Sequence, residues 1–431
     1  MEFSVVEGLR TIKFDLVLSL ALAALALFAG YFVQRRVGFL SRANIPAAAV
    51  GGLLFAALVF ALRSGGVAGV SLNTTLRAPL QTAFFTTIGL SATTTLLRAG
   101  GWRMGFLWLL ATLTAVVQNV VGMAIAVALG APALLGVICG ALTLTGGPAT
   151  GLAWADRFEA LGVSGAGSLI VASAMFGIFT SSLVGNPVAT ALIRRFRLAP
   201  RAEEKKESED EFWALSPTIA PEEEGEDARA FNDKGVAVED EKSELSAGVL
   251  LHNLLLVLLV MGLGALLSLL IKHPSFTLPD YIGAMVVAAV VRNVDDRTRW
   301  LRLNARAVEL IAGVALALFL ALALMSLELW KIAGLALPMI VILCAQVLVM
   351  IAYAALVTFP LMGRDYEAAV TAGGHIGFGL GITANAVANM EALVERFAPA
   401  PRSFLVVPIV GAFFIDFSNA LVIFLFTSFA R

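Results

Sequence analysis

Gly373-Gly374-His375-Ile376-Gly377-Phe378-Gly379-Leu380-Gly381 interrupts an apolar stretch in the second half of this chain, and Thr145-Gly146-Gly147-Pro148-Ala149-Thr150-Gly151 does so at the matching place in the first. Lipid cannot hydrogen-bond a peptide group. An unwound segment at membrane depth is therefore tolerated only inside protein or against a water-filled cavity. Paired broken segments of this kind indicate the substrate site of a transporter.

Composition predicts a membrane protein around these tracts. The chain has 431 residues, of which 59% are hydrophobic and 14% charged, whereas soluble domains carry about 25% charged residues. Apolar stretches long enough to span a bilayer fall at about 14–33, 45–62, 78–97, 103–129, 163–193, 247–271, 279–292, 304–327, 331–358 and 403–428. We expect an all-α polytopic protein of about ten transmembrane helices, with the first stretch retained as a span and not cleaved as a signal peptide.

An acidic segment divides the chain into two membrane halves. Arg201 to Glu244 contains 16 acidic and six basic residues, a net charge of −10, so the rest of the chain carries about +9. Such a segment cannot bury a core, and we expect 198–246 to be a solvated linker, with a regulatory docking tail as the alternative. The predicted halves are 1–197, with a re-entrant hairpin at 133–159, and 247–431, with a hairpin at 366–395.

Spacing suggests that the two halves are repeats. Gln118 precedes Gly146 by 28 residues, and Gln346 precedes Gly374 by the same 28. Five spans per half would give the second copy the inverted topology typical of secondary transporters. Because basic loops stay cytoplasmic, the distribution of arginines predicts that both termini lie outside and the linker inside.

The hairpins supply the candidate substrate site. Exposed peptide groups and positive helix N-termini suit a carboxylate. The candidate residues are Thr145, Gly146, Gly147, Thr150, Gly151, Gly373, Gly374, His375, Gly377, Thr383 and Asn385. The competing interpretation of the glycines is a close-packed helix–helix face.

Asp416 is the candidate ion-binding residue, because an acid near the middle of a span is costly unless it has a partner. We expect it to hold Na⁺ or a substrate ammonium group, together with Asn419, Asn119 or Gln346. A structural ion pair is the alternative for Asp416, and contact between helices is the alternative for the amides. Enzymes are disfavoured, since the chain has no phosphate loop, no His-Glu-x-x-His and no Gly-x-Ser-x-Gly.

At these residues the chain resembles the sodium/glutamate symporters of bacteria. The resemblance rests on the following segments: Phe84–Leu90, Leu97–Gly101, Gln118-Asn119, Thr145–Gly151 with Trp154, His375–Gly381, Ala388–Met390, Glu395–Phe397 and Phe404–Asp416. It implies Na⁺-coupled glutamate symport across the inner membrane, a homodimer of inverted five-span repeats, and an elevator-like motion. The resemblance also implies that Gly146, Gly147, Thr150, Gly151, Gly374, His375 and Gly377 lie in the translocation site.

Two departures from the family pattern adjoin that site. Pro148 and Ala149 replace a usual His-Gly in the first tract, and Ala384 replaces a usual proline after the second. Because of these departures, the substrate is either glutamate or a related amino acid. The alternative function is a carrier of 2-hydroxycarboxylates or dicarboxylates, or a proton-coupled carrier.

Overall fold

The computed structural model describes residues 2–6, 9–42, 45–94, 101–198, 246–271, 280–331 and 333–429. Nearly all of the predicted linker, 198–246, lies outside these ranges. Within them, eight helices are long and apolar enough to cross a membrane. The chain is therefore a multi-pass, almost entirely helical membrane protein, as the composition predicts.

The first half contains five long helices and one broken pair. Its helices are α1 (Leu16–Arg36), α2 (Gly38–Arg42), α3 (Ala47–Ser64), α4 (Arg77–Ser91), α6 (Gly101–Ala128), α7 (Ala133–Val137), η1 (Ile138–Leu142), α8 (Gly147–Ala160) and α9 (Ala166–Phe196). Asp15 caps α1, since its side chain accepts a hydrogen bond from the Leu18 N–H. The 15-residue α4 was predicted as a span, but it is shorter than the eight helices that qualify.

The second half follows the same order after residue 246. Its helices are α11 (Ala247–Ile271), α12 (Asp280–Thr298), α13 (Ala305–Met325), η3 (Leu329–Lys331), η4 (Ala333–Leu335), α14 (Ala336–Tyr353), η5 (Ala354–Thr358), α15 (Phe359–Leu361), α16 (Tyr366–Leu380), α17 (Thr383–Val394), α18 (Pro401–Ile409), η6 (Val410–Phe414) and α19 (Ile415–Phe429). Charged residues at the end of α12 exclude it from the eight candidate spans. The segments η1, η5 and η6 are π-helical, a geometry that often marks functional sites.

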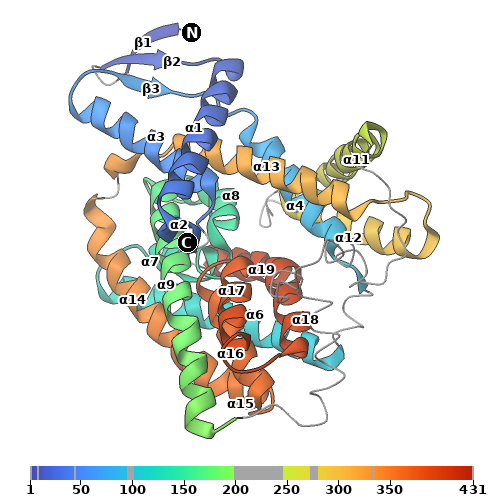
Figure 1. The fold of residues 1–431 in the computed structure, drawn as a ribbon. Helices are drawn as coiled ribbons and strands as arrows, with labels where there is room; N and C mark the ends of the chain where they lie inside the picture. Colours follow the sequence, from blue (N-terminus) through green and yellow to red (C-terminus); the bar gives the residue numbers. More distant parts are fainter. Residues whose placement is uncertain are drawn as a thin grey trace.

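A small sheet at the N-terminus departs from the all-α prediction. Strand β1 (Glu2–Val6) pairs antiparallel with β2 (Leu9–Lys13), and β2 pairs in parallel with β3 (Gly69–Ser71). β3 lies in the connection between α3 and α4, so the sheet fastens the chain terminus to that connection (Figure 1).

The helices pack into two units that draw on both halves of the sequence. We call α1, α3, α4, α11, α12 and α13 the peripheral unit, because these helices pack mainly on one another. We call α6 to α9 together with α14 to α19 the hairpin unit. Figure 1 shows α13 crossing above the hairpin unit toward α4, α11 and α12. Each unit therefore combines the corresponding helices of the two halves.

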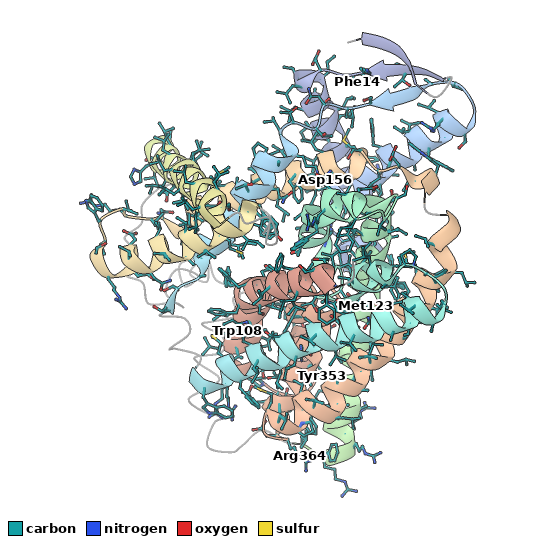
Figure 2. The ribbon with its side chains drawn as sticks, turned by 180° about the vertical axis from the view of Figure 1, so that it is seen from behind. Phe14, Trp108, Met123, Asp156, Tyr353 and Arg364 are labelled. Carbon is teal, nitrogen blue, oxygen red and sulfur yellow. The ribbon has the colours of Figure 1, made fainter. Side chains whose placement is uncertain are left out.

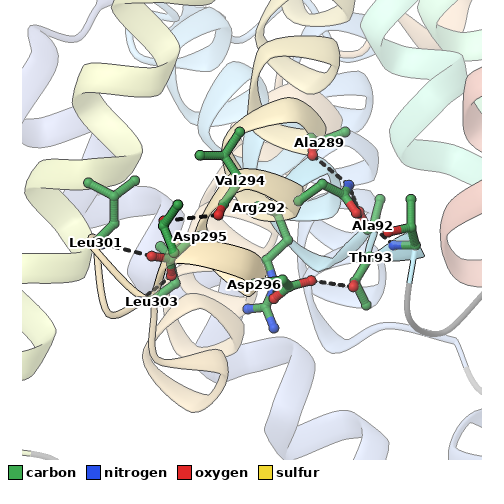
Figure 3. A network of polar contacts seen from close by, with 12 residues as sticks. Ala92, Thr93, Ala289, Arg292, Val294, Asp295, Asp296, Leu301 and Leu303 are labelled. Carbon is green, nitrogen blue, oxygen red and sulfur yellow. Dashed lines mark hydrogen bonds and ion pairs between the residues drawn. The ribbon is translucent and has the colours of Figure 1, made fainter.

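A polar network joins α4 to α12 inside the peripheral unit (Figure 3). Asp296 pairs with Arg292 at 2.8 Å and also accepts a hydrogen bond from the Thr93 hydroxyl. Asn293 donates to the carbonyl of Ala92. These contacts satisfy carbonyl and hydroxyl groups where α4 ends, and they fix that end against its neighbour.

Candidate functional site

The first hairpin is interrupted near its predicted tract. Its break begins at Gly140, whose backbone is not helical (φ −110°, ψ −136°). The chain then turns and starts α8 at Gly147, which has the positive φ of 68° that favours glycine. Pro148 occupies the first turn of α8, where its missing N–H costs nothing.

The second tract is not unwound, and that prediction is wrong. Gly373 to Leu380 belong to the continuous helix α16, all of whose residues are buried. A Cβ on Gly377 would lie 2.3 Å from the Cα of Ala386, and one on Gly374 would lie 2.8 Å from the sulfur of Met390. These glycines therefore serve close packing of α16 against α17, which is the competing interpretation given above.

The break of the second hairpin lies at the end of its glycine tract. Gly381 (φ −141°, ψ −122°) and the extended Ile382 separate α16 from α17. A Cβ on Gly147 would lie 3.1 Å from Cγ2 of Ile382 and 3.8 Å from the carbonyl oxygen of Gly381. The two breaks thus touch, and both α8 and α17 begin at the point of contact.

Gln118 on α6 connects the two hairpins. Its Nε2 donates to the carbonyl of Gly379 at 2.7 Å, and its Oε1 accepts from the Thr145 hydroxyl at 2.7 Å. The Gln118 carbonyl accepts from Nε2 of Gln346 at 2.6 Å. The side chains that make these bonds, Gln118, Thr145 and Gln346, are all buried. This network therefore fixes the hairpins relative to each other.

Two asparagines hold the peptide groups released by the first break. Oδ1 of Asn119 accepts from the Ala141 N–H at 2.9 Å, and Nδ2 of Asn419 donates to the Ala141 carbonyl at 3.0 Å. Among the described residues, no hydrogen bond reaches Oδ1 of Asn419, Oε1 of Gln346 or Nδ2 of Asn119, although all three atoms are buried. Buried polar atoms without partners are costly, and the two oxygens are suited to a cation.

Asp416 lies three residues before Asn419 at the start of α19, directly after the π-helical η6. Within the described ranges, no hydrogen bond or salt bridge reaches its carboxylate. The residue is half-buried. The segment directly before it, η6, contacts α4 of the peripheral unit.

Other predicted residues lie away from the contact between the tips. His375 is fully buried, with Nδ1 2.9 Å from the Thr358 hydroxyl and Nε2 3.4 Å from that of Thr114. Asn385 donates from Nδ2 to the Ile178 carbonyl in α9. Gly151 is packed against Ile170. These residues support the hairpins, whereas Gly146 and Thr383 at the tips are partly exposed.

The sequence alone did not place three further residues in the site, namely Trp154, Tyr281 and Arg77. Trp154 on α8 donates from Nε1 to the Tyr281 hydroxyl at 2.7 Å. Arg77 on α4 donates to the Leu152 carbonyl at 2.9 Å. Both contacts join the two units, and no local motif marks them, because the partners are more than 70 residues apart in the chain.

Near the α6–α19 contact, a tryptophan packs against the residues on either side of Asp416. Trp108, labelled in Figure 2, donates from Nε1 to the Ser418 hydroxyl at 3.1 Å and packs against Phe414 with ring centroids 5.5 Å apart. Thr112 also contacts Ser418, at 2.8 Å. These contacts hold the first turn of α19, which contains Asp416.

Two broken helix pairs that meet inside a multi-pass helical bundle are the architecture of a secondary transporter. The family profile described as "Sodium/glutamate symporter" matches residues 12–399. The chain belongs to the sodium/glutamate symporter family.

Named relatives agree with this assignment over nearly the whole chain. The sodium/glutamate symporter of Escherichia coli (strain K12) is 38% identical over 410 residues, covering 95% of this chain and 96% of the relative. The one of Shigella flexneri gives the same values. That of Haemophilus influenzae (strain ATCC 51907 / DSM 11121 / KW20 / Rd) is 34% identical over 403 residues, covering 93% and 94%. These names confirm the prediction of a transporter and not an enzyme.

Proposed function

We propose that this protein carries out Na⁺-coupled symport of L-glutamate, or a closely related acidic amino acid, across the bacterial cytoplasmic membrane. The observation that supports this most directly is the meeting of the α8 and α17 N-termini at Gly147 and Ile382. Helix N-termini favour negative charge, so two of them at one point suit a carboxylate. The names of the relatives supply the substrate and the ion.

In this proposal the substrate contacts the hairpin tips. The tip residues are Thr145, Gly146, Gly147, Thr150 and Thr383, and Gly151 lies behind them, where it packs α8 against Ile170. Gly373, Gly374, Gly377, His375 and Asn385 belong to the same site indirectly, because they pack or anchor the second hairpin beneath the tips.

Na⁺ is assigned to the region between Asp416 and the amide cluster. The carboxylate of Asp416 and the unpartnered oxygens of Asn419 and Gln346 are oxygen donors of the kind that Na⁺ requires. Asn119 plays a different part, since its oxygen already accepts from Ala141. It holds the broken backbone in place for the cation.

Transport follows from a difference in affinity between two states. Na⁺ and substrate drive the cycle only if each binds one arrangement of the units better than the other. The separation into a peripheral and a hairpin unit supports an elevator-like displacement of the hairpin unit. We extend the proposal to two inverted repeats of five spans and a hairpin, to a homodimer, and to external termini with a cytoplasmic linker.

The experiment is uptake of labelled L-glutamate into proteoliposomes that contain the full chain. We expect accumulation with an inward Na⁺ gradient and a fall to background when choline replaces Na⁺. Uptake that is equal in choline would remove Na⁺ as the coupling ion.

A second candidate is a carrier of 2-hydroxycarboxylates or dicarboxylates, or a proton-coupled carrier. It is favoured by Pro148, Ala149 and Ala384, which place side chains without hydrogen-bonding groups beside the tips. Competition for uptake by glutamate, aspartate, citrate and malate distinguishes the substrates. Dissipating the proton gradient distinguishes the ions.

A further inference from the structure

Helix α8 of the first hairpin is tied to the peripheral unit at two points. The first is Arg77, whose Nη2 donates to the Leu152 carbonyl at 2.9 Å and whose Nη1 lies 3.4 Å from Oδ1 of Asp156. The Arg77 side chain is 18% exposed and that of Asp156 is 87% exposed. Figure 2 shows Asp156 where the hairpin unit meets the peripheral unit.

The second point lies between these two residues on α8. Trp154, which is 1% exposed, donates to the hydroxyl of Tyr281, which is 2% exposed. The Tyr281 ring stacks on Phe85 of α4 with centroids 4.1 Å apart, so its direction is fixed from the peripheral side.

Both contacts depend strictly on the position of α8. Hydrogen bonds weaken steeply with distance and angle, so a displacement of α8 along α4 and α12 by even a few ångströms breaks them. Breaking the second contact leaves a buried indole N–H without its partner. The contacts therefore favour the arrangement of the two units in this structure.

We propose that Arg77 and Tyr281 are positioning residues that latch α8, and with it the first hairpin, to the peripheral unit in one state of the transport cycle. The latch must open when the hairpin unit moves. This inference rests on the proposed transport function.

The test measures the arrangement of the units directly. Spin labels at Thr75→Cys on the approach to α4 and Ala160→Cys at the end of α8, both exposed, report the distance across the boundary in nanodiscs. Cys344→Ala removes the exposed native thiol. Tyr281→Phe retains the ring stacking and loses the hydroxyl, and Arg77→Gln loses the charge.

We expect each variant to shift the ratio of the two distance populations about fivefold away from the arrangement in this structure, the effect of roughly one hydrogen bond. Matched controls are Tyr353→Phe, which removes a bond to the Leu110 carbonyl inside the hairpin unit, and Arg292→Gln, which removes an ion pair inside the peripheral unit. Neither control should move the ratio.

Unchanged distance distributions in both latch variants would overturn the proposal, and a shift in only one would overturn its two-point form. Equal shifts in the controls would also overturn it, since the effect would then be general loosening. The distances are read without transport. A wild-type protein that fails to take up glutamate with Na⁺ would therefore refute the proposed function and leave this test interpretable.

Discussion

The side-chain amide of Gln118 donates to the Gly379 carbonyl at 2.7 Å, across 261 residues of sequence. The bond joins a helix of the first half to the hairpin of the second, two residues before its break at Gly381. The same amide accepts a hydrogen bond from Thr145 in the other hairpin. One buried side chain therefore sets the distance between the two hairpins.

Replacing Gln118 with leucine should loosen this connection. The change removes the hydrogen-bond partner of the Gly379 carbonyl and of the Thr145 hydroxyl. We expect this loss to lower the free energy of unfolding by about 2–3 kcal/mol and to abolish most uptake. A thermal unfolding scan and an uptake assay measure the two effects. Gln81→Leu is the control, since Gln81 on α4 is half-buried and makes no hydrogen bond with the described residues. Wild-type uptake in Gln118→Leu would contradict the prediction.

Asp416→Asn should abolish Na⁺-dependent uptake while expression and thermal stability stay near wild type. The change is nearly isosteric and removes only the charge that would hold a cation. Glu309→Gln provides the control, because Glu309 is exposed on α13. Full uptake by Asp416→Asn would reduce this carboxylate to a structural role.

Asn419→Ala tests whether Asn419 binds Na⁺ or the substrate. It removes the unpartnered Oδ1 together with the bond to the Ala141 carbonyl. We expect the Na⁺ concentration for half-maximal uptake to rise about tenfold, as loss of one good ligand contact implies, with a smaller change in glutamate KM at saturating Na⁺. Asn186→Ala on α9, whose side chain accepts from Thr190 and from no other described residue, should change neither constant. A rise confined to glutamate KM would move Asn419 into the substrate site.

Gly147→Ala should impair transport beyond its effect on stability. Alanine at φ 68° costs about 1 kcal/mol, and its Cβ would also meet Ile382 at 3.1 Å. Gly130→Ala separates the two effects, because Gly130 has φ 71° and nothing within 4 Å of the added carbon. We expect similar losses of stability in both variants and a loss of uptake only in Gly147→Ala. Equal uptake would show that the tips tolerate extra volume.

The sequence predicted the helical membrane fold and the first break, because composition and a Thr-Gly-Gly-Pro run are local signals. It failed at Gly373–Leu380, since glycine permits both an unwound backbone and close helix packing. Only the neighbours Ala386 and Met390 decide between these outcomes, and they are brought there by the turn at Gly381. The short N-terminal strands were missed for a similar reason, because β2 depends on a partner at Gly69–Ser71.

Some of the polar residues singled out from the sequence lie near the first break, and their roles in binding stay predictions. Asn119 and Asn419 bind the peptide groups of Ala141 at the first break, and Gln346 binds the Gln118 carbonyl on α6, since polar side chains in apolar helices must find partners. Tyr281 and Arg77 carried no such signal. Their importance comes from the boundary between two units, and a boundary exists only after the chain has folded.

The complete burial of α16 has a consequence for how the second hairpin deforms. Because every residue of α16 is buried, this helix cannot bend or rotate without displacing the residues packed around it. Helix α17, in contrast, begins with the partly open Thr383 and the exposed Ala384. Deformation of this hairpin is therefore easiest at the exposed N-terminus of α17, next to Gly381.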